Sequence, residues 1–154
     1  MHLTLPAAAA SVPEARHAVV ELARQLGARP STVADVALAV SEACTNVVLH
    51  AYREHDEPGV LHVDAEARDG MLEVVVADEG GGLRPREDSP GLGMGMALMA
   101  AVASGLQLDH DGAATRVHLT FDLSPEPGEA GEAGTRAGAA GDDAAPDGAL
   151  ADRD

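Results

Sequence analysis

The sequence predicts an α/β protein: a two-layer sandwich in which helices lie on one face of a mixed, mostly antiparallel sheet. Three observations lead to this class. Long segments carry apolar residues at helical spacing, short segments are typical of strands, and their order is strand, two helices, two strands, helix, two strands. With 154 residues, of which 45% are apolar, the chain is long enough for one domain with a substantial core.

A short strand and a helix are expected first. Residues 3–6 are strand-like, and Ser11 and Glu14 have the spacing of a capping box that begins a helix. Gly27 ends this helix after residue 26. Its apolar side chains recur every three or four residues, so it buries one face: Ala15, Val19, Leu22 and Leu26.

A second, longer helix follows Pro30, with Ser31 or Thr32 as its expected cap. It extends to about Tyr52 with almost no interruption. Its apolar positions share one side, which predicts a helix that packs on the sheet.

Two hairpins complete the sheet. The first joins residues 59–67 and 71–77 through Asp69-Gly70, a pair that suits a two-residue turn. The second joins residues 106–110 and 115–123. Between the hairpins, residues 78–95 are rich in glycine and predict a loop, and residues 96–103 predict a third helix.

The charge of the chain limits its partners. Ten basic and 26 acidic residues give a formal charge of −16. A phosphate backbone needs clustered cations, so this balance argues against nucleic-acid binding and favours a basic or a small partner. All ten basic residues are arginines. The absence of lysine excludes a Walker A loop, a Schiff-base enzyme and the strand lysine of eukaryotic-type protein kinases.

The composition changes after Ser124. Residues 125–154 are nearly all Ala, Gly, Pro, Asp and Glu, with eight acids against two arginines. Such a segment cannot bury enough apolar area to offset its ordering entropy. We therefore expect a domain over residues 1–124, with a formal charge of −10, and a disordered acidic tail over residues 125–154, with −6.

A cytoplasmic protein with no membrane segment is expected. No basic residue precedes the first apolar stretch, which Pro6 interrupts, so no signal peptide is predicted. No uninterrupted apolar run reaches the ~18 residues of a membrane span. Cys44 is the single cysteine, which excludes an internal disulfide and a Cys-rich zinc site, and its apolar neighbours favour a small core residue over a nucleophile.

Glu42, Asn46 and His50 lie four residues apart on the second expected helix and form one polar stripe. A carboxylate can accept a proton or orient a nucleophile, and an amide oxygen one turn away can ligate Mg²⁺. Taken alone, the stripe is better explained as the solvated edge of an amphipathic helix, which is the commoner case.

Two glycine-rich segments follow. Asp78 ends an apolar strand and begins the pattern D-x-G-x-G, in which Gly80 and Gly82 allow close approach to a flat ligand and the carboxylate can accept from an exocyclic amine. A plain turn has the same pattern. Three further glycines precede the third helix, Gly91, Gly93 and Gly95, where free backbone N–H groups form an anion site.

This second segment fails the dinucleotide-binding pattern, because position 96 is Met and no strand leads directly into it. Without lysine, a polyphosphate would depend on the backbone amides, a divalent cation and Arg84 or Arg86. A flexible connector explains the segment as well if it is taken alone. Five histidines show no paired metal-ligand spacing and are interpreted as surface or packing residues: His50, His55, His62, His110 and His118.

Taken together, the order of these motifs resembles the ATPase fold of gyrase, Hsp90, histidine kinases and MutL, known as the Bergerat fold. The stretch S-E-A-C-T-N-V-V-L-H-A-Y over residues 41–52 is similar, more narrowly, to the bacterial anti-sigma factor serine/threonine kinases, whose typical pattern is S-E-A-x-x-N-x-x-x-H-[AG]-Y. The resemblance covers about residues 1–124.

The resemblance implies a role for each matching residue. Glu42 would be the general base, and Asn46 the ligand of Mg²⁺. Asp78 would bind the amino group of adenine, and Thr115 would support it. The glycines would complete the ATP site, at the base pocket and under the phosphates: Gly80, Gly82, Gly91, Gly93 and Gly95.

The resemblance also implies partners. Kinases of this family transfer the γ-phosphoryl group of ATP to Ser or Thr of an anti-anti-sigma protein, and otherwise hold a sigma factor inactive; homodimer formation is left open. Residues 89–92, Ser-Pro-Gly-Leu, lack the arginine that sporulation-type members place near the phosphates. A second hypothesis therefore stays open, a nucleotide-dependent switch module that binds its partner without phosphoryl transfer. A histidine kinase is disfavoured because the chain has no room for a dimerisation helix pair.

Overall fold

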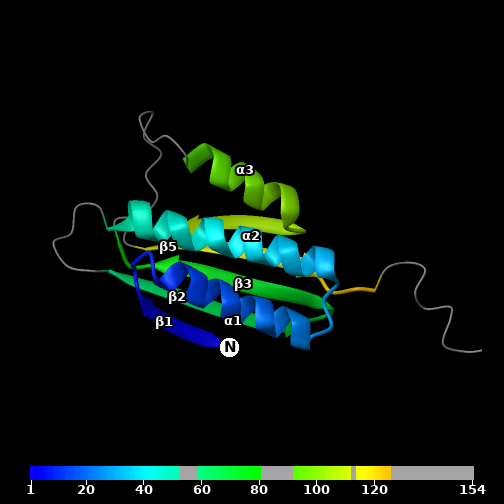
Figure 1. The fold of residues 1–154 in the computed structure, drawn as a ribbon. Helices are drawn as coiled ribbons and strands as arrows, with labels where there is room; N and C mark the ends of the chain where they lie inside the picture. The colour runs from blue at the N-terminus through cyan, green and yellow to red at the C-terminus, as the bar shows by residue number, and fades with distance from the viewer. Residues whose placement is uncertain (53–58, 81–91, 112–113, 126–154) are drawn as a thin grey trace, which may run out of the picture.

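The computed structural model describes residues 1–52, 59–80, 92–111 and 114–125. Three α-helices lie on one face of a five-stranded sheet, and the opposite face carries no helix of the described chain (Figure 1). The elements follow one another in the predicted order: β1 (His2–Pro6), α1 (Ser11–Gln25), α2 (Pro30–Asn46), η1 (Val47–Ala51), β2 (Val60–Arg68), β3 (Met71–Asp78), α3 (Leu92–Val102), β4 (Gly105–His110) and β5 (Thr115–Asp122).

The sheet has the strand order β1-β2-β3-β5-β4, and each neighbouring pair is antiparallel. The α/β sandwich is as predicted, but the expected mixture of pairings is not found among the described strands. The connection through α3 makes β4 run parallel to β3, and β5 then lies between them. No two parallel strands are therefore hydrogen-bonded neighbours.

The hairpin between β2 and β3 turns at the predicted Asp-Gly pair. Arg68 and Met71 face each other across the ladder, and Asp69 and Gly70 between them have φ values of 52° and 78°. Two successive positive φ angles are the conformation of a type I′ turn, whose twist matches that of the flanking strands. This local choice sets the register of the whole hairpin.

The end of α1 is also as predicted. Gly27 has a φ of 78°, its N–H donates to the Arg24 carbonyl at 3.0 Å, and the Ala28 N–H donates to the Ala23 carbonyl at 2.9 Å. These two bonds form a Schellman motif, which requires a left-handed residue after the helix.

The beginnings of α1 and α2 differ from the prediction. Ser11 is the first residue of α1 and is buried, and no side-chain bond caps this helix, so the capping box is not formed. Helix α2 begins at Pro30, with Arg29 before it, rather than after a Ser31 or Thr32 cap. Proline in the first turn lacks an N–H that would need a partner, so the helix can begin at Pro30, two residues earlier than a Ser31 cap would place its start.

Helix α2 is the centre of the helical layer. It contacts α1, α3 and the strands β3 and β5, and its inner side chains are fully buried, among them Val36, Val40 and Cys44. Together with η1 it spans 22 residues, Pro30–Ala51, with a mean hydropathy of 1.4 in its most apolar window. By length and hydropathy alone, this helix could span a membrane. In this fold the helix packs between α1 and α3 and against the sheet.

The last turn of the expected long helix is not α-helical. After Asn46 the chain continues as the π-helical turn η1, Val47–Ala51, in which Val47 and Ala51 are buried. A π-turn widens the backbone by one residue, and such turns are frequent at functional sites. Nothing in the apolar spacing of residues 47–51 indicates this change.

Helix α3 begins at Leu92, four residues before the predicted start at residue 96. Gly93 and Gly95 are therefore inside its first turns instead of in the loop. Glycine disfavours a helix interior by roughly 1 kcal/mol relative to alanine, which is why the sequence predicts a loop here. Gly95 is buried against α2, so tertiary packing outweighs its low helix propensity.

Candidate functional site

A carboxylate occupies a core position at the end of β3. Alternate residues of this strand face the helices, and Leu72, Val74, Val76 and Asp78 are all buried. The first three are apolar, and Asp78, at 2% exposure, continues their series. Burial of a carboxylate is costly unless hydrogen bonds compensate it, so this position is not explained by packing.

The neighbours of Asp78 supply part of that compensation. The Gly80 N–H donates to its Oδ1 at 3.0 Å, and Thr115, directly opposite on β5 and also 2% exposed, hydrogen-bonds it as well. Burial raises the pKa of Asp78, while these bonds and the nearby charge of His110 oppose the increase. The family resemblance implies that Asp78 and Thr115 belong to one site, and the two residues are paired across β3 and β5 in the structure.

The residue after this pair has no room for a side chain. A Cβ at Gly80 would collide with the carbonyl oxygen of Ala51, the last residue of η1. Only glycine allows the end of β3 and the end of the long helix to approach so closely. The predicted glycine is therefore required by this contact within the protein.

A second group of candidate residues meets between α2 and α3. A Cβ at Gly95 would lie 2.9 Å from Glu42 Oε2 and 3.7 Å from Asn46 Oδ1. The carboxylate and the amide thus face the same point at the first turns of α3. The exposed N–H groups of a helix N-terminus attract anions, so a phosphate close to this point would meet both the amides and the polar stripe.

Asn46 is buried at 5% exposure, and its Nδ2 has no hydrogen-bond partner among the described residues. A buried amide nitrogen with no partner costs about 1–3 kcal/mol. An amide beside a metal–phosphate group can ligate the cation through its oxygen and donate to a phosphate through its nitrogen. Glu42 and Asn46 supply oxygen atoms of the kind that Mg²⁺ prefers, and the unpaired amide nitrogen of Asn46 can donate to a phosphate. These groups therefore fit Mg²⁺ bound to a polyphosphate.

The remaining candidates divide into two sets. Gly93, in the first turn of α3, is exposed, and no atom of the described residues is close enough to contact an added Cβ. Four residues lie outside the described residues: Gly82, Arg84, Arg86 and Gly91.

Cys44 is a core residue, as expected. Its side chain is completely buried, and burial raises the pKa of the thiol to about 12, so the reactive thiolate is absent at neutral pH. Among the described histidines, His62 bonds Thr4 and Glu79, and His118 pairs with Asp109. The described residues contain no group of three His, Cys, Asp or Glu side chains arranged to hold a metal ion.

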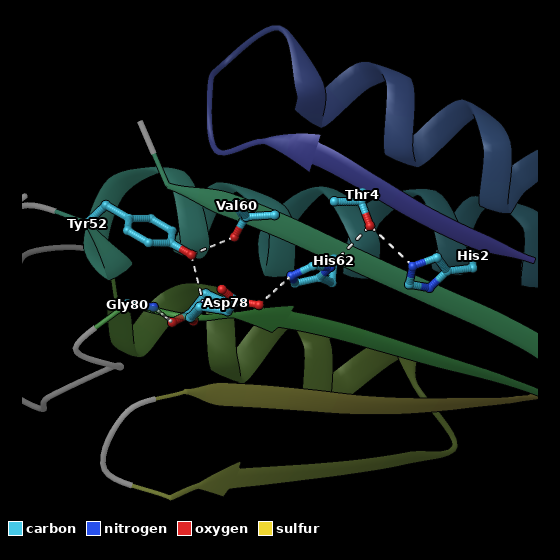
Figure 2. A network of polar contacts seen from close by, with 8 residues as sticks. His2, Thr4, Tyr52, Val60, His62, Asp78 and Gly80 are labelled. Atoms are coloured by element: carbon cyan, nitrogen blue, oxygen red, sulfur yellow. Dashed lines mark hydrogen bonds and ion pairs between the residues drawn. The ribbon is translucent and has the colours of Figure 1, made fainter. Parts of the chain in front are cut away.

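Tyr52 was part of the motif but received no role from the sequence. Its hydroxyl donates to the Val60 carbonyl at 2.6 Å and accepts from the Glu79 N–H at 2.8 Å (Figure 2). Its partners are 8 and 27 residues away along the chain. The one sequence feature that could have indicated this contact is the motif over residues 41–52, whose last position is a tyrosine.

A groove of about 450 Å³ between α1 and α2 lies apart from these residues. Its lining is apolar except for Arg24 and includes none of the candidate side chains: Val20, Arg24, Ala28, Pro30, Val33, Ala34 and Ala37. This groove therefore lacks the carboxylate and amide groups that the structure brings together in the candidate site.

Comparison with known families shows which family the chain belongs to. The family described as "Histidine kinase-like ATPase domain" matches residues 5–121. The chain belongs to this family. A relative named anti-sigma F factor, from Clostridium botulinum (strain Eklund 17B / Type B), is 31% identical over 123 residues, which cover 71% of this chain and 85% of that protein.

A second relative places the ATPase domain in the same group. The serine-protein kinase RsbW of Bacillus thuringiensis (strain Al Hakam) is 29% identical over 126 residues, 72% of this chain and 78% of that protein. The resemblance to the anti-sigma factor serine/threonine kinases, inferred from residues 41–52, is therefore confirmed.

Solved structures agree on the fold of this ATPase domain. The RsbU and RsbW domains of a Mycobacterium tuberculosis protein superpose with a TM-score of 0.66 and 28% identity, covering 81% of this chain and 32% of that chain. A histidine kinase domain from Erythrobacter litoralis EL346 superposes with a TM-score of 0.51 and 26% identity, over 60% of this chain and 45% of that chain. The chain spans less than half the length of either solved structure.

Proposed function

We propose that this ATPase domain is an anti-sigma factor that binds Mg-ATP and transfers the γ-phosphoryl group to a serine or threonine of an anti-anti-sigma protein. The observation that carries the proposal is the pair of Glu42 and Asn46 facing Gly95, on a chain whose relatives are named anti-sigma factor and serine-protein kinase. A general base beside a phosphate site is what phosphoryl transfer to a hydroxyl requires.

Each residue has one step in this proposal. The buried carboxylate of Asp78 accepts a hydrogen bond from the exocyclic amine of adenine, supported by Thr115. Asn46 holds Mg²⁺, which when bound neutralises phosphate charge. The first turns of α3, with Gly93 and Gly95, supply N–H groups to the phosphates.

Glu42 then acts on the acceptor protein. Its carboxylate takes the proton of a serine or threonine hydroxyl, whose oxygen forms a bond to the γ-phosphorus while the bond from that phosphorus to the β–γ bridging oxygen breaks. The products are a phosphorylated acceptor and ADP. Glu42 lies on α2 within reach of the first turns of α3, so the base and the phosphate site belong to one interface between two helices.

The second partner is a sigma factor, and we propose that the protein acts in the cytoplasm, where sigma factors bind polymerase. A sigma factor exposes basic surface that contacts DNA, and the formal charge of −16 on this chain complements it. Complementary charge raises the association rate more than the affinity. The rate of association should therefore fall steeply as salt rises in stopped-flow mixing, and a flat dependence would leave acidity as a device for solubility alone.

The proposal is tested with the purified protein, ATP labelled at the γ-phosphate, and the anti-anti-sigma candidates encoded in the same genome. Calorimetry measures ATP affinity with and without Mg²⁺. We expect tight binding only with Mg²⁺, weaker binding of Asn46→Ala, and label on one candidate. Binding without transfer to any candidate would favour the switch module, and equal affinity with and without Mg²⁺ would overturn the role of Asn46.

A further inference from the structure

The hydroxyl of Tyr52 bonds to the backbone of two segments that lie later in the chain, at the start of β2 and directly after β3. It donates to the carbonyl of Val60, at the start of β2, and accepts from the N–H of Glu79, directly after β3 (Figure 2). At 2.6 and 2.8 Å, both bonds have good hydrogen-bond lengths. The end of the long helix is thereby fastened to both strands of the central hairpin at the same level.

The ring of Tyr52 has a dedicated place. A Cβ at Gly59 would collide with the ring, so only glycine at this position leaves room for it. The neighbouring Ala51 carbonyl contacts Gly80 in the same way. Two successive helix-end residues, Ala51 and Tyr52, therefore pack against glycines on the segments that flank Asp78.

Ala51 and Tyr52 contact the two residues that follow Asp78 and not its carboxylate. The Gly80 N–H holds its Oδ1, and the Tyr52 hydroxyl holds the backbone of Glu79 between them. The Glu79 side chain is held separately by the Nε2 atom of His62 at 3.1 Å (Figure 2). The segment from Asp78 to Gly80 is thus held by the bond between Gly80 and Asp78 and by the bonds of Glu79 to Tyr52 and His62.

We propose that Tyr52 is a positioning residue for recognition of the nucleotide base: it fixes the Asp78 carboxylate relative to the helix that carries Glu42 and Asn46. This inference rests on the proposed function, in which Asp78 receives the exocyclic amine. Asn46 and Tyr52 are separated only by η1, so the π-turn and the tyrosine set the distance between the phosphate end and the base end of the site.

The inference predicts a loss of discrimination. Adenine presents an amine donor where hypoxanthine presents a carbonyl acceptor, and a fixed carboxylate accepts from the first and repels the second. If the carboxylate is less firmly held, ATP loses more binding than inosine triphosphate. Hydroxyl removal leaves the ring in place, so Tyr52→Phe isolates the two hydrogen bonds.

The experiment compares Mg-ATP and Mg-inosine triphosphate affinities of the full chain by calorimetry, for wild type and Tyr52→Phe. We expect Tyr52→Phe to bind ATP about three- to tenfold more weakly, with inosine triphosphate changed less than twofold, so that the preference for ATP falls by about the same factor. Phe121→Leu is the matched control, because this buried ring lies on β5 opposite Leu72, away from Asp78. It should lower the melting temperature and leave the preference for ATP unchanged.

A Tyr52→Phe protein with wild-type preference for ATP overturns the inference and leaves the proposed function intact. Equal losses for both nucleotides, or the same change in Phe121→Leu, also overturn it, because they indicate general destabilisation. A wild type that binds neither nucleotide overturns the proposed function and, with it, this inference. Gly59→Ala is the second variant: its methyl group enters the space of the ring, so it should reduce the preference for ATP in the same direction.

Discussion

The two ends of the β2–β3 hairpin are built in different ways. At the turn end, Asp69 and Gly70 close the hairpin with two positive φ angles, and Leu72 and Phe121 pair beside it in a fully apolar core. At the other end, Asp78 lies opposite Thr115, with both side chains buried. Both pairs join β3 to β5 and lie three core-facing positions apart. The buried side chains are apolar in the first pair and polar in the second.

This difference separates stability from binding. Burial of an apolar side chain contributes roughly 1.5–3 kcal/mol, whereas a buried carboxylate costs free energy unless its bonds compensate it. Polar burial at the Asp78 end therefore supports the proposal that a nucleotide base completes the hydrogen bonding there. Burial raises the pKa of Asp78, and buried titratable groups with a shifted pKa are typical of functional sites, whereas the turn end has no such group in its apolar core.

The largest expected effect is the loss of phosphoryl transfer in Glu42→Gln. The amide keeps the shape of the side chain but cannot accept the hydroxyl proton, so the rate should fall by about 10²–10⁴ while ATP affinity stays close to wild type. Single-turnover transfer to the acceptor protein and calorimetry measure the two quantities. Transfer at the wild-type rate would remove Glu42 from the reaction.

The turn end should respond in the opposite manner. Phe121→Ala removes a ring with 1% exposure and should lower the free energy of unfolding by about 3–5 kcal/mol. At a temperature where the variant is folded, its ATP affinity should match that of wild type, because Phe121 pairs with Leu72 and not with Asp78. Urea unfolding and calorimetry check both halves, and a large loss of affinity would contradict the separation of the two ends.

Asp78→Asn should weaken binding and stabilise the fold at once. A hydrogen bond to a charged group contributes about 1.5–3 kcal/mol, so ATP affinity should fall by roughly one to two orders of magnitude. Burial raises the pKa of Asp78 above its ordinary value of 3.8, so the ionised group destabilises the folded state at neutral pH, and asparagine removes that cost.

The pH dependence has a definite sign. The folded state of wild type binds the Asp78 proton more tightly than the unfolded state, so this residue lowers stability as pH rises from 3.8 through the raised pKa. The stability advantage of Asp78→Asn should therefore be complete above the raised pKa and vanish below 3.8. Urea unfolding of both proteins across this range tests it, and an advantage that grows at low pH would contradict the assignment.

The smallest expected effect is that of removing the tail. Residues 125–154 contain one leucine and no other large apolar side chain, so they have little to contribute to a core. A protein that ends at Ser124 should melt within about 1–2 °C of the full chain and bind ATP equally well. A clearly lower melting temperature would show that the tail packs on the domain.

Much of the fold follows from local chemistry. The Asp69-Gly70 turn and the Gly27 helix end were predicted correctly, because positive φ angles favour glycine whatever surrounds it. The start of α3 was not, because Gly93 and Gly95 disfavour a helix and only contact with α2 stabilises one there. The candidate residues were recognised from their order along the chain. Residue type and spacing indicated what their groups could do, and the resemblance assigned a role to each.

The sequence by itself determined the α/β class, the order of the elements, the family and the identity of the candidate residues. Apolar periodicity and turn residues are short-range signals, and a motif is recognised from the linear sequence alone. Only the tertiary structure decided that Asp78 is buried opposite Thr115, that Glu42 and Asn46 face Gly95, and that Tyr52 holds the end of β3. These contacts join segments that lie dozens of residues apart. Their free energy depends on long-range packing, which no local sequence pattern indicates.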